Sequence, residues 1–413
     1  MKKTMGKDAR NTVVGLDIGT SKIVALVAEV LPDGRMDVIG LGSHESKGLR
    51  KGVVVNIEAT VAAIQRALEE AESMADCKIQ RVHTGIAGSH IRSFNSTGMV
   101  AIKDKEVTPI DVERAIETAR AMPIPNDQQV LHILTQEFVI DGQDGIREPL
   151  GMSGHRLEVK VHIVTGAVSA AQNIVKCVRR CGLEVADLVL QPLASSVAVL
   201  SEDEKELGVA LVDIGGGTTD IAIFTQGAIR HTAVIPIAGD QITSDIAMAL
   251  RTPTPEAEAI KTRHGVALRQ LADPREMVAV PGLGDRGLRE LSRQTLAEVI
   301  EPRVEELYSL VQQVLRQSGY EELLSSGIVL TGGSAVMRGM VELGEEIFHT
   351  PVRLGIPRYS GALADVVRNP RFATAVGLLM EGKSQLDRGV MARQGGSFKQ
   401  TLARMREWFQ KNF

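Results

Sequence analysis

Residues 208–220 read GVALVDIGGGTTD. An apolar run ends at Asp213, three glycines follow, and hydroxyl side chains come directly after them. This order predicts a strand, a tight turn and a second strand. Residues 13–22, VVGLDIGTSK, repeat the plan around Asp17. Because the two aspartates lie about half the chain length apart, the sequence predicts two related halves, each with one hairpin.

Both turns contain the chemical groups of a phosphate site. Glycine leaves backbone N–H groups open to an anion, because no side chain blocks the approach. A carboxylate can hold Mg²⁺ through water, and hydroxyls or a lysine can bind the remaining phosphate oxygens. A third turn, 332–334, follows an apolar strand and is expected to open a helix against which a nucleoside lies. Each turn alone could be an ordinary glycine turn, but the three together predict nucleotide binding.

The candidate nucleotide-binding residues are Asp17, Gly19, Thr20, Ser21, Lys22, Asp213, Gly215, Gly216, Gly217, Thr218, Gly332, Gly333 and Ser334. Asp17 and Asp213 are also the candidate Mg²⁺ ligands, through water.

Periodicity in the rest of the chain predicts alternating strands and helices. Between 84 and 165, short strands flank one helix over 111–121, which predicts an inserted small α+β subdomain. Residues 383–396 are polar and contain glycine, which predicts a flexible linker. Further helices are expected over 57–74, 168–181, 192–200, 243–250, 255–262 and 371–380, with one long helix over 288–317 bent near Pro302.

Composition limits the function classes. The 413 residues include 47 Lys or Arg and 51 Asp or Glu, so the net charge of −4 gives no basic field for nucleic acid. Aromatic residues make up 3%, too few for base-stacking platforms. Three cysteines make no disulfide framework, which favours a reducing cytosol. The basic N-terminus lacks the apolar core of a signal peptide, and no run approaches the roughly 18 apolar residues of a spanning helix.

The C-terminal segment differs in charge from the rest of the chain. From Lys383 to Phe413, basic residues outnumber acidic ones by five, although the whole chain is negative. Written as a helix, 397–413 places large apolar side chains three or four positions apart, with basic side chains around them. This pattern predicts an amphipathic helix lying on anionic membrane lipid. A helix of a soluble core, or one that binds a partner helix, could show the same pattern.

The apolar residues of this segment are Phe398, Leu402, Met405, Trp408, Phe409 and Phe413, and the basic ones are Lys399, Arg404, Arg406 and Lys411. A single helix of this kind is expected to bind reversibly, so firm attachment would need many copies on one filament.

The chain resembles the actin, Hsp70 and sugar-kinase ATPase superfamily, whose nucleotide-cleft motifs occur here in family order. The matching segments are 17–22 (phosphate-1), 191–196 (connect-1), 213–220 (phosphate-2), 332–334 (adenosine) and 373–377 (connect-2). The resemblance implies an actin-like two-lobed α/β fold, built from duplicated RNase H-like domains, with ATP and Mg²⁺ between the lobes. Gln191 stands at a predicted strand-to-helix junction, where a polar side chain can either reach into a cleft and orient water or simply cap the helix. The resemblance implies that Gln191 orients water and that Glu258 and Lys261 contact the ribose and base. We expect at most a slow ATPase, because no residue singles itself out as a strong general base.

Within this superfamily the chain resembles the FtsA family of bacterial cell-division proteins. The segments that match are 212–218, 235–236, 243–247, 257–261, 296–303 and 327–333. The resemblance implies an ATP-binding protein that self-assembles and tethers filaments of the tubulin-like GTPase FtsZ to the cytoplasmic face of the inner membrane at the division septum. It also implies recruitment of later division proteins. The FtsZ C-terminal peptide is expected on the subdomain of the long helix, with Arg293 and Arg303 as candidate contacts.

We expect the chain to divide into four subdomains and a membrane-targeting tail. The ranges are 11–83 with 166–204 and 369–382 for subdomain 1A, 84–165 for the inserted 1C, 205–243 with 318–368 for 2A, 244–317 for 2B, 383–396 for the linker and 397–413 for the amphipathic helix.

Other interpretations are less consistent with the sequence. A small-molecule kinase of the same superfamily, the alternative function, would have no use for a membrane helix. An Hsp70-like chaperone would need a separate substrate domain, which we do not expect after Gly382. Residues 377–384 match the P-loop pattern but follow a helix and run into a polar segment, where a P-loop must join a strand to a helix. Residues 282–287 match the dinucleotide pattern and lie between a strand-like run and a helix, but no second strand follows to close a βαβ unit. Cys177 and Cys181 are expected to be buried apolar residues rather than metal ligands.

Overall fold

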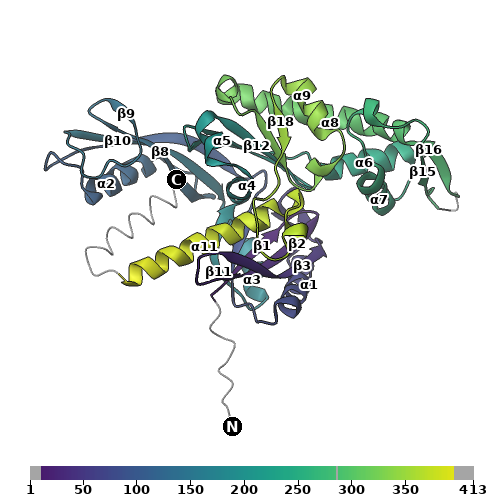
Figure 1. Cartoon of the computed structure of the whole chain (residues 1–413), viewed down its shortest axis with the longest axis horizontal. Helices are drawn as coiled ribbons and strands as arrows, with labels where there is room; N and C mark the ends of the chain where they lie inside the picture. The colour runs from purple at the N-terminus through teal and green to yellow at the C-terminus, as the bar shows by residue number, and fades with distance from the viewer. Residues whose placement is uncertain (1–10, 285–286, 395–413) are drawn as a thin grey trace, which may run out of the picture.

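The computed structural model describes residues 11–284 and 287–394, which form two lobes built on the same sheet plan (Figure 1). The strand order is β11-β6-β1-β2-β3 in lobe 1 and β14-β13-β12-β17-β18 in lobe 2. In each sheet, three consecutive strands pair antiparallel and two later strands add in parallel. The repeated topology confirms the two related halves, each with one hairpin.

The strands of lobe 1 are β1 (Thr12–Ile18), β2 (Lys22–Val30), β3 (Met36–Glu45), β6 (Arg81–Ile86) and β11 (Glu184–Leu190), with the short pair β4 (Leu49–Arg50) and β5 (Val53–Val54) beside them. Those of lobe 2 are β12 (Val209–Ile214), β13 (Thr219–Thr225), β14 (Ala228–Ile235), β17 (Ile328–Thr331) and β18 (Val352–Leu354).

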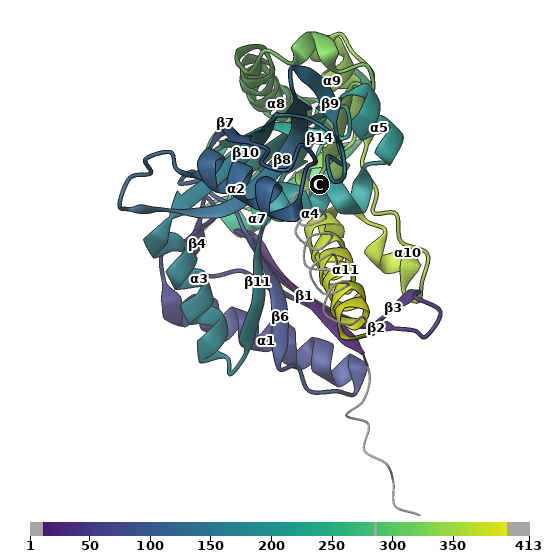
Figure 2. The same cartoon turned by 90° about the vertical axis from the view of Figure 1, so that its left-hand side faces the viewer.

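Helices cover both faces of the lobe 1 sheet (Figure 2). One face is covered by α1 (Ile57–Ala75) and α3 (Val168–Arg180), and the other by α4 (Gln191–Val199) and α11 (Ala373–Gln394). Helix α1 begins where Asn56 accepts a hydrogen bond from the N–H of Ala59. A side chain on Gly42 of β3 would overlap the carbonyl of Ala67, so this glycine lets α1 lie close to the sheet. The apolar faces of these elements form one buried core.

Lobe 2 has its own core, formed by its sheet and a set of helices at its outer end. The helices are α6 (Gly239–Leu250), α7 (Thr254–His264), α8 (Arg293–Ser318) and α9 (Met340–Phe348), with a hairpin of β15 (Met277–Val280) and β16 (Arg289–Ser292). The short helix α5 (Glu202–Leu207) has no buried residue and contacts β13 instead. A short helix, α10 (Ala364–Val367), lies in the return to lobe 1 before α11.

A smaller α+β unit is inserted between β6 and α3 of lobe 1, as predicted. Its sheet has the order β7-β10-β8-β9, and α2 covers one face (Figure 2). Helix α2 begins in a capping box between Thr108 and Asp111. The elements are β7 (Arg92–Ala101), α2 (Pro109–Arg120), β8 (Gln128–Ile140), β9 (Gln143–Ile146) and β10 (Arg156–Ala167), which share a separate core.

The insert also contacts β14, the edge strand of lobe 2, through polar side chains. Gln136 donates to the carbonyl of Ile229 at 2.9 Å, and Ser93 donates to the carbonyl of Thr232 at 3.0 Å. His162 is buried between Asn95 and the hydroxyl of Thr232, and burial lowers its pKa to about 3. The insert therefore forms hydrogen bonds with lobe 2 as well as with lobe 1, where the Leu190 N–H of β11 donates to His132 of β8 at 2.9 Å.

The long helix predicted over 288–317 begins later than expected. Residues 289–292 form β16, which pairs with β15 in a hairpin, and α8 starts at Arg293. The 282–287 pattern therefore lies between two strands rather than between a strand and a helix. Helix α8 continues past Pro302, as predicted. The turn 332–334 does not open a long helix either, because only a single 3₁₀ turn follows before α9 begins at Met340.

The last described helix is longer than predicted. Residues 383–394, expected as a flexible linker, continue α11 through Gln394. Lys383 pairs with Asp387 at 3.1 Å, one turn apart, and Gln385 donates to Asp187 of lobe 1 at 2.7 Å, so local contacts stabilise this extension. Residues 377–384, which match the P-loop pattern, lie inside this helix and not between a strand and a helix, so they cannot form a P-loop.

The predicted amphipathic helix 397–413 and its candidate membrane residues lie outside the described residues. Among the residues that are described, none of the helices has the length and apolar character to cross a bilayer.

Candidate nucleotide site

The two glycine turns, far apart in the sequence, lie against each other between the lobes. Each is closed in the same way: Gly19 N–H donates to Lys22 O at 3.1 Å, and Gly215 N–H donates to Thr218 O at 3.0 Å. A Cβ built on Gly217 would lie 2.7 Å from the Thr20 hydroxyl oxygen. Only glycine at position 217 allows the two turns to approach so closely.

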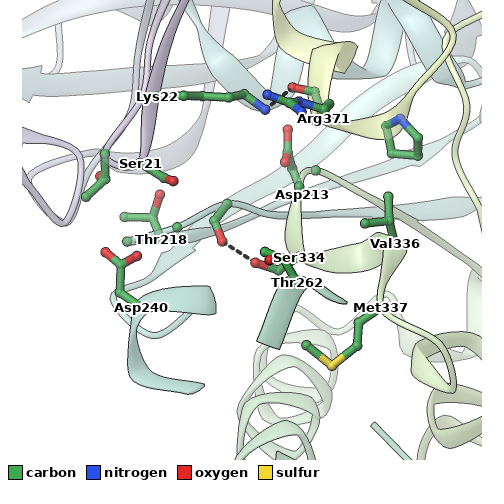
Figure 3. Close-up of a pocket in the computed structure, with 18 of the residues that line it drawn as sticks. Ser21, Lys22, Asp213, Thr218, Asp240, Thr262, Ser334, Val336, Met337 and Arg371 are labelled. Carbon is green, nitrogen blue, oxygen red and sulfur yellow. Dashed lines mark hydrogen bonds between the residues drawn. The ribbon is translucent and has the colours of Figure 1, made fainter. Parts of the chain in front are cut away.

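A cavity of about 610 Å³ lies beside the paired turns, and residues of both lobes line it. Figure 3 shows Ser21 and Lys22 of lobe 1 facing Asp213 and Thr218 of lobe 2 across this space. All the candidate nucleotide-binding residues from the three turns line the cavity, together with Gln191, Glu258 and Lys261. The structure therefore brings together residues that the sequence places far apart.

Three buried aspartates, Asp17, Asp213 and Asp220, line the cavity near enough for their charges to interact. The pKa of Asp17 is raised to about 7, because burial and, to a smaller extent, the nearby Asp213 carboxylate outweigh the lowering effect of the Lys22 charge. Burial and the other two carboxylates raise the pKa of Asp220 to about 7. The pKa of Asp213 is also raised by burial. Carboxyl groups buried together in this way are stabilised in their charged form by a cation.

Two cationic side chains lie beside these aspartates. Lys22 donates to the backbone carbonyl of Arg371 at 2.6 Å (Figure 3). Its ammonium group also lies over the ring of Phe372. Burial and the Arg371 guanidinium lower the pKa of Lys22 to about 8. A second cation so close to Lys22 disfavours its charge, so an anionic ligand such as phosphate would stabilise both groups.

Glu258 and Lys261, expected from the resemblance to contact ribose and base, line the same cavity. They form an ion pair at 2.7 Å on one face of α7. Lys261 also donates to the Gly239 carbonyl at 3.0 Å, and Thr243 donates to the Glu258 carboxylate. Ser334 donates to the Gly215 carbonyl at 2.8 Å, so the third glycine turn is bonded to the second one. These contacts fix the wall of the cavity against which a nucleoside would lie.

Gln191 lines the cavity as predicted and is tightly positioned. Its side-chain nitrogen donates to Asp17 at 3.0 Å. A Cβ on Gly85 would lie 2.7 Å from Cγ of Gln191, so the side chain rests directly on the neighbouring strand. Gln191 is thus held at the first residue of α4, next to a candidate Mg²⁺ ligand.

The two arginines expected to contact an acidic peptide are already paired within their own lobe. Arg293 pairs with Glu276 at 2.7 Å and also lines the nucleotide cavity. Arg303 pairs with Asp245 at 2.5 Å and with Glu306. An acidic peptide that binds to either guanidinium would have to compete with these carboxylates.

Several lining residues were not singled out by the sequence. Asp220 is the last residue of 208–220 and directly follows two threonines, so the sequence could have indicated it as a further acidic residue of the site. Asp240 follows Ile235-Pro236 without a recognisable local pattern, and its pKa is raised by burial. Arg371 lies in the 3₁₀ turn Pro370–Phe372 before α11, one turn ahead of the helix, and its side chain alone gave no signal of a place in the cavity.

The two lobes, their repeated sheets and the cavity between them define an actin-like ATPase fold, a nucleotide-binding class. Solved structures share this fold. A chain of the PilM-PilN type IV pilus biogenesis complex aligns with a TM-score of 0.66 at 19% identity, covering 90% of this chain and 98% of that one. MreB5 of Spiroplasma citri bound to ADP aligns with a TM-score of 0.54 at 14% identity, covering 94% and 99%.

Sequence comparison gives the family. The family model "Cell division protein FtsA" matches residues 210–377, and "SHS2 domain inserted in FTSA" matches 88–165, the inserted unit. Cell division protein FtsA of Pseudomonas aeruginosa is 63% identical over 408 residues, covering 97% of this chain and 98% of that protein. Its namesake from Escherichia coli strain K12 is 48% identical over 418 residues, covering 98% and 99%. The chain belongs to the FtsA family of bacterial cell-division proteins.

Proposed function

We propose that this chain binds ATP with Mg²⁺ between its lobes. The observation that supports this most is the contact of the two glycine turns beside a cavity lined by Lys22 and by Asp17, Asp213 and Asp220. Backbone N–H groups at both turns would bind the phosphates, and the third turn with Glu258 and Lys261 would hold the nucleoside. A ligand that spans both lobes stabilises the closed arrangement, because it binds that arrangement more tightly than an open one.

The three aspartates fit a hydrated Mg²⁺. Asp220 Oδ1 is buried and has no hydrogen-bond partner among the described residues, as expected of an oxygen that accepts from a metal-bound water. The described residues contain no group of three acidic, histidine or cysteine side chains placed to hold a metal directly. Asp17, Asp213 and Asp220 would therefore hold the ion through water. When bound, Mg²⁺ would neutralise part of the phosphate charge.

Hydrolysis is proposed to be slow. Gln191, held by Asp17, would orient a water molecule near the phosphates. An amide orients water but accepts no proton at neutral pH. The cavity carboxylates Asp17, Asp213 and Asp220 are proposed to hold hydrated Mg²⁺, whose charge would keep them ionised and weak as bases. The site is therefore better suited to binding ATP and sensing its phosphates than to rapid turnover.

Replacement of Asp213 by alanine tests the nucleotide site. We expect Asp213→Ala to lower ATP affinity in Mg²⁺ at least about tenfold, because a ligand-facing charged group is lost. Asp104→Ala, an exposed carboxylate in the insert, is the matched control and should bind as the unsubstituted protein does. Isothermal titration of the full chain gives both affinities. Equal affinity of the two variants would count against the cleft as the ATP site.

The cellular role that we propose follows from the family. FtsA-family membership supports a part in cell division, with self-assembly and other division proteins as partners. In finer terms, the chain would form ATP-dependent filaments on the cytoplasmic face of the inner membrane at the septum. There it would tether FtsZ through the FtsZ C-terminal peptide, docked on the subdomain of α8, and recruit later division proteins. A small-molecule kinase is not favoured, because the relatives are cell-division proteins.

Membrane attachment is proposed through the segment 397–413. Its large apolar residues and basic residues would bind anionic lipid, each basic residue adding about 1 kcal/mol near the surface. Sedimentation with anionic vesicles compares the full chain with a chain that ends at Gln394, and vesicles of neutral lipid are the control. We expect the full chain to sediment with anionic vesicles and the shorter chain to stay in solution. Equal sedimentation of both would refute the anchor.

A further inference from the structure

Helix α4 forms hydrogen bonds with a cavity aspartate of each lobe. Gln191, its first residue, donates to Asp17 at 3.0 Å, and Ser195 donates to Asp213 Oδ2 at 2.6 Å. Residues four apart lie on the same face of a helix, so a single turn of α4 reaches both carboxylates. Asp17 belongs to lobe 1, as α4 does, but Asp213 belongs to lobe 2. The bond from Ser195 therefore crosses from one lobe to the other.

A second hydroxyl from lobe 1 supports the same carboxylate. Thr374, in α11, donates to Asp213 Oδ2 at 3.4 Å and lies 3.0 Å from the Ser195 hydroxyl. The hydroxyls meet because α11 and α4 cross closely: a Cβ on Gly377 would overlap the Ala194 carbonyl. Ser195 is fully buried and Thr374 is 9% exposed, so water does not compete for these bonds.

These two hydrogen bonds fix one carboxylate oxygen of Asp213, and the other oxygen lies against the third glycine turn. Oδ2 accepts hydrogen bonds from both hydroxyls. Oδ1 lies beside the third glycine turn of the cavity, so close to Gly332 that a Cβ on that residue would overlap it. Hydrogen bonds to an ionised carboxylate are shorter and stronger than those between neutral groups, and they fix its direction. Loss of the short bond would let the carboxylate rotate in the cavity.

We propose that Ser195, supported by Thr374, is a positioning residue that fixes Asp213 across the lobes and sets how strongly Mg²⁺ promotes nucleotide binding. This inference rests on the proposed Mg²⁺–ATP site. Ser195 itself is absent from the lining of the cavity, so it acts through the orientation of Asp213 and not by contact with the ligand.

A merely structural role for Ser195 predicts a different result. A buried serine that only fills space would change the stability of the fold when altered and leave the Mg²⁺ effect unchanged. The next residue supplies a matched control, because Ser196 is also buried in α4 but donates to the Leu193 carbonyl of its own helix at 2.7 Å. Ser196→Ala thus removes a buried hydroxyl from the same turn without touching Asp213.

The test measures ATP affinity of the full chain with saturating Mg²⁺ and with the metal chelated. We expect Ser195→Ala to lower affinity about tenfold with Mg²⁺, the loss typical of a hydrogen bond to a charged group, and to leave the metal-free affinity nearly unchanged. Ser196→Ala should leave the ratio of the two affinities as in the unsubstituted protein. In an Asp213→Asn background, Ser195→Ala should have no further effect on that ratio, because the carboxylate that it positions is gone.

The outcomes separate this inference from the proposed function. Failure of the unsubstituted protein to bind ATP would refute the nucleotide site itself. ATP binding with an equal Mg²⁺ effect in Ser195→Ala and Ser196→Ala would overturn only the positioning role. Should Ser195→Ala fail to fold, Thr374→Val keeps the side-chain volume, removes the second hydroxyl and is expected to reduce the Mg²⁺ effect in the same direction. A folded Thr374→Val with an unchanged Mg²⁺ effect would then overturn the proposal.

Discussion

Contact between the two glycine turns makes Gly217 a sensitive position. A Cβ there would lie 2.7 Å from Oγ1 and 2.8 Å from Cγ2 of Thr20, closer than unbonded atoms approach without displacement. Thr20 cannot easily turn away, because its hydroxyl accepts the Gly52 N–H at 3.0 Å. Overpacking of this size typically costs about 1–3 kcal/mol. We therefore expect Gly217→Ala to lower the melting temperature by roughly 2–10 °C.

The control for this variant is another glycine of the same cavity. Gly333→Ala places its Cβ 3.9 Å from the nearest atoms, at a φ of −66° that alanine accepts, so the nucleotide-free melting temperature should change little. Differential scanning calorimetry without nucleotide measures both variants. Thr20→Ala removes the two closest atoms and should reduce the effect of Gly217→Ala when the two are combined. Additive effects of Thr20→Ala and Gly217→Ala would refute the contact between the turns.

The remaining predictions concern charge and the insert. The pKa of Asp220 is about 7 in the folded chain against about 3.9 when unfolded, so its ionisation destabilises the fold as pH rises from 4 to 7. Asp220→Asn should therefore add little to the free energy of unfolding below pH 4 and at most ~4 kcal/mol at pH 8. Thermal unfolding of both proteins at a series of pH values measures this difference. A stabilisation that does not change with pH would contradict a buried charge at Asp220. Gln136→Leu leaves the Ile229 carbonyl without its donor and should cost about 1–3 kcal/mol. Hydrogen exchange should then quicken across β14, and unchanged exchange would mean that the insert does not stabilise this strand.

Local sequence was sufficient for the parts of the fold that depend on neighbours in the chain. The hairpins around Asp17 and Asp213 form because apolar strands flank glycines that permit a tight turn. Gln191 was predictable because a polar residue at a strand-to-helix junction points along the carboxyl edge of the sheet, where the cavity lies. The family resemblance supplied what local pattern could not, namely the place of Glu258 and Lys261.

Features that depend on distant partners were not predictable. Residues 289–292 have helical spacing, but pairing with β15 draws them into a strand. Residues 383–394 look like a linker, but contact with lobe 1 extends α11 through them. Ser195 and Thr374 are ordinary small residues among apolar neighbours, and only the crossing of α4 and α11 brings their hydroxyls to Asp213. The raised pKa values of Asp17 and Asp220 were not predictable either, because they arise from burial between segments that are far apart in the chain.

A crystal structure of the full chain grown with Mg²⁺ and a non-hydrolysable ATP analogue tests the central claim most directly. The account predicts a triphosphate that contacts residues 19–22 of lobe 1 and residues 215–218 of lobe 2. Hydrated Mg²⁺ should lie near Asp17, Asp213 and Asp220. A nucleotide bound outside this cavity, or one that contacts the turn of a single lobe, would contradict it.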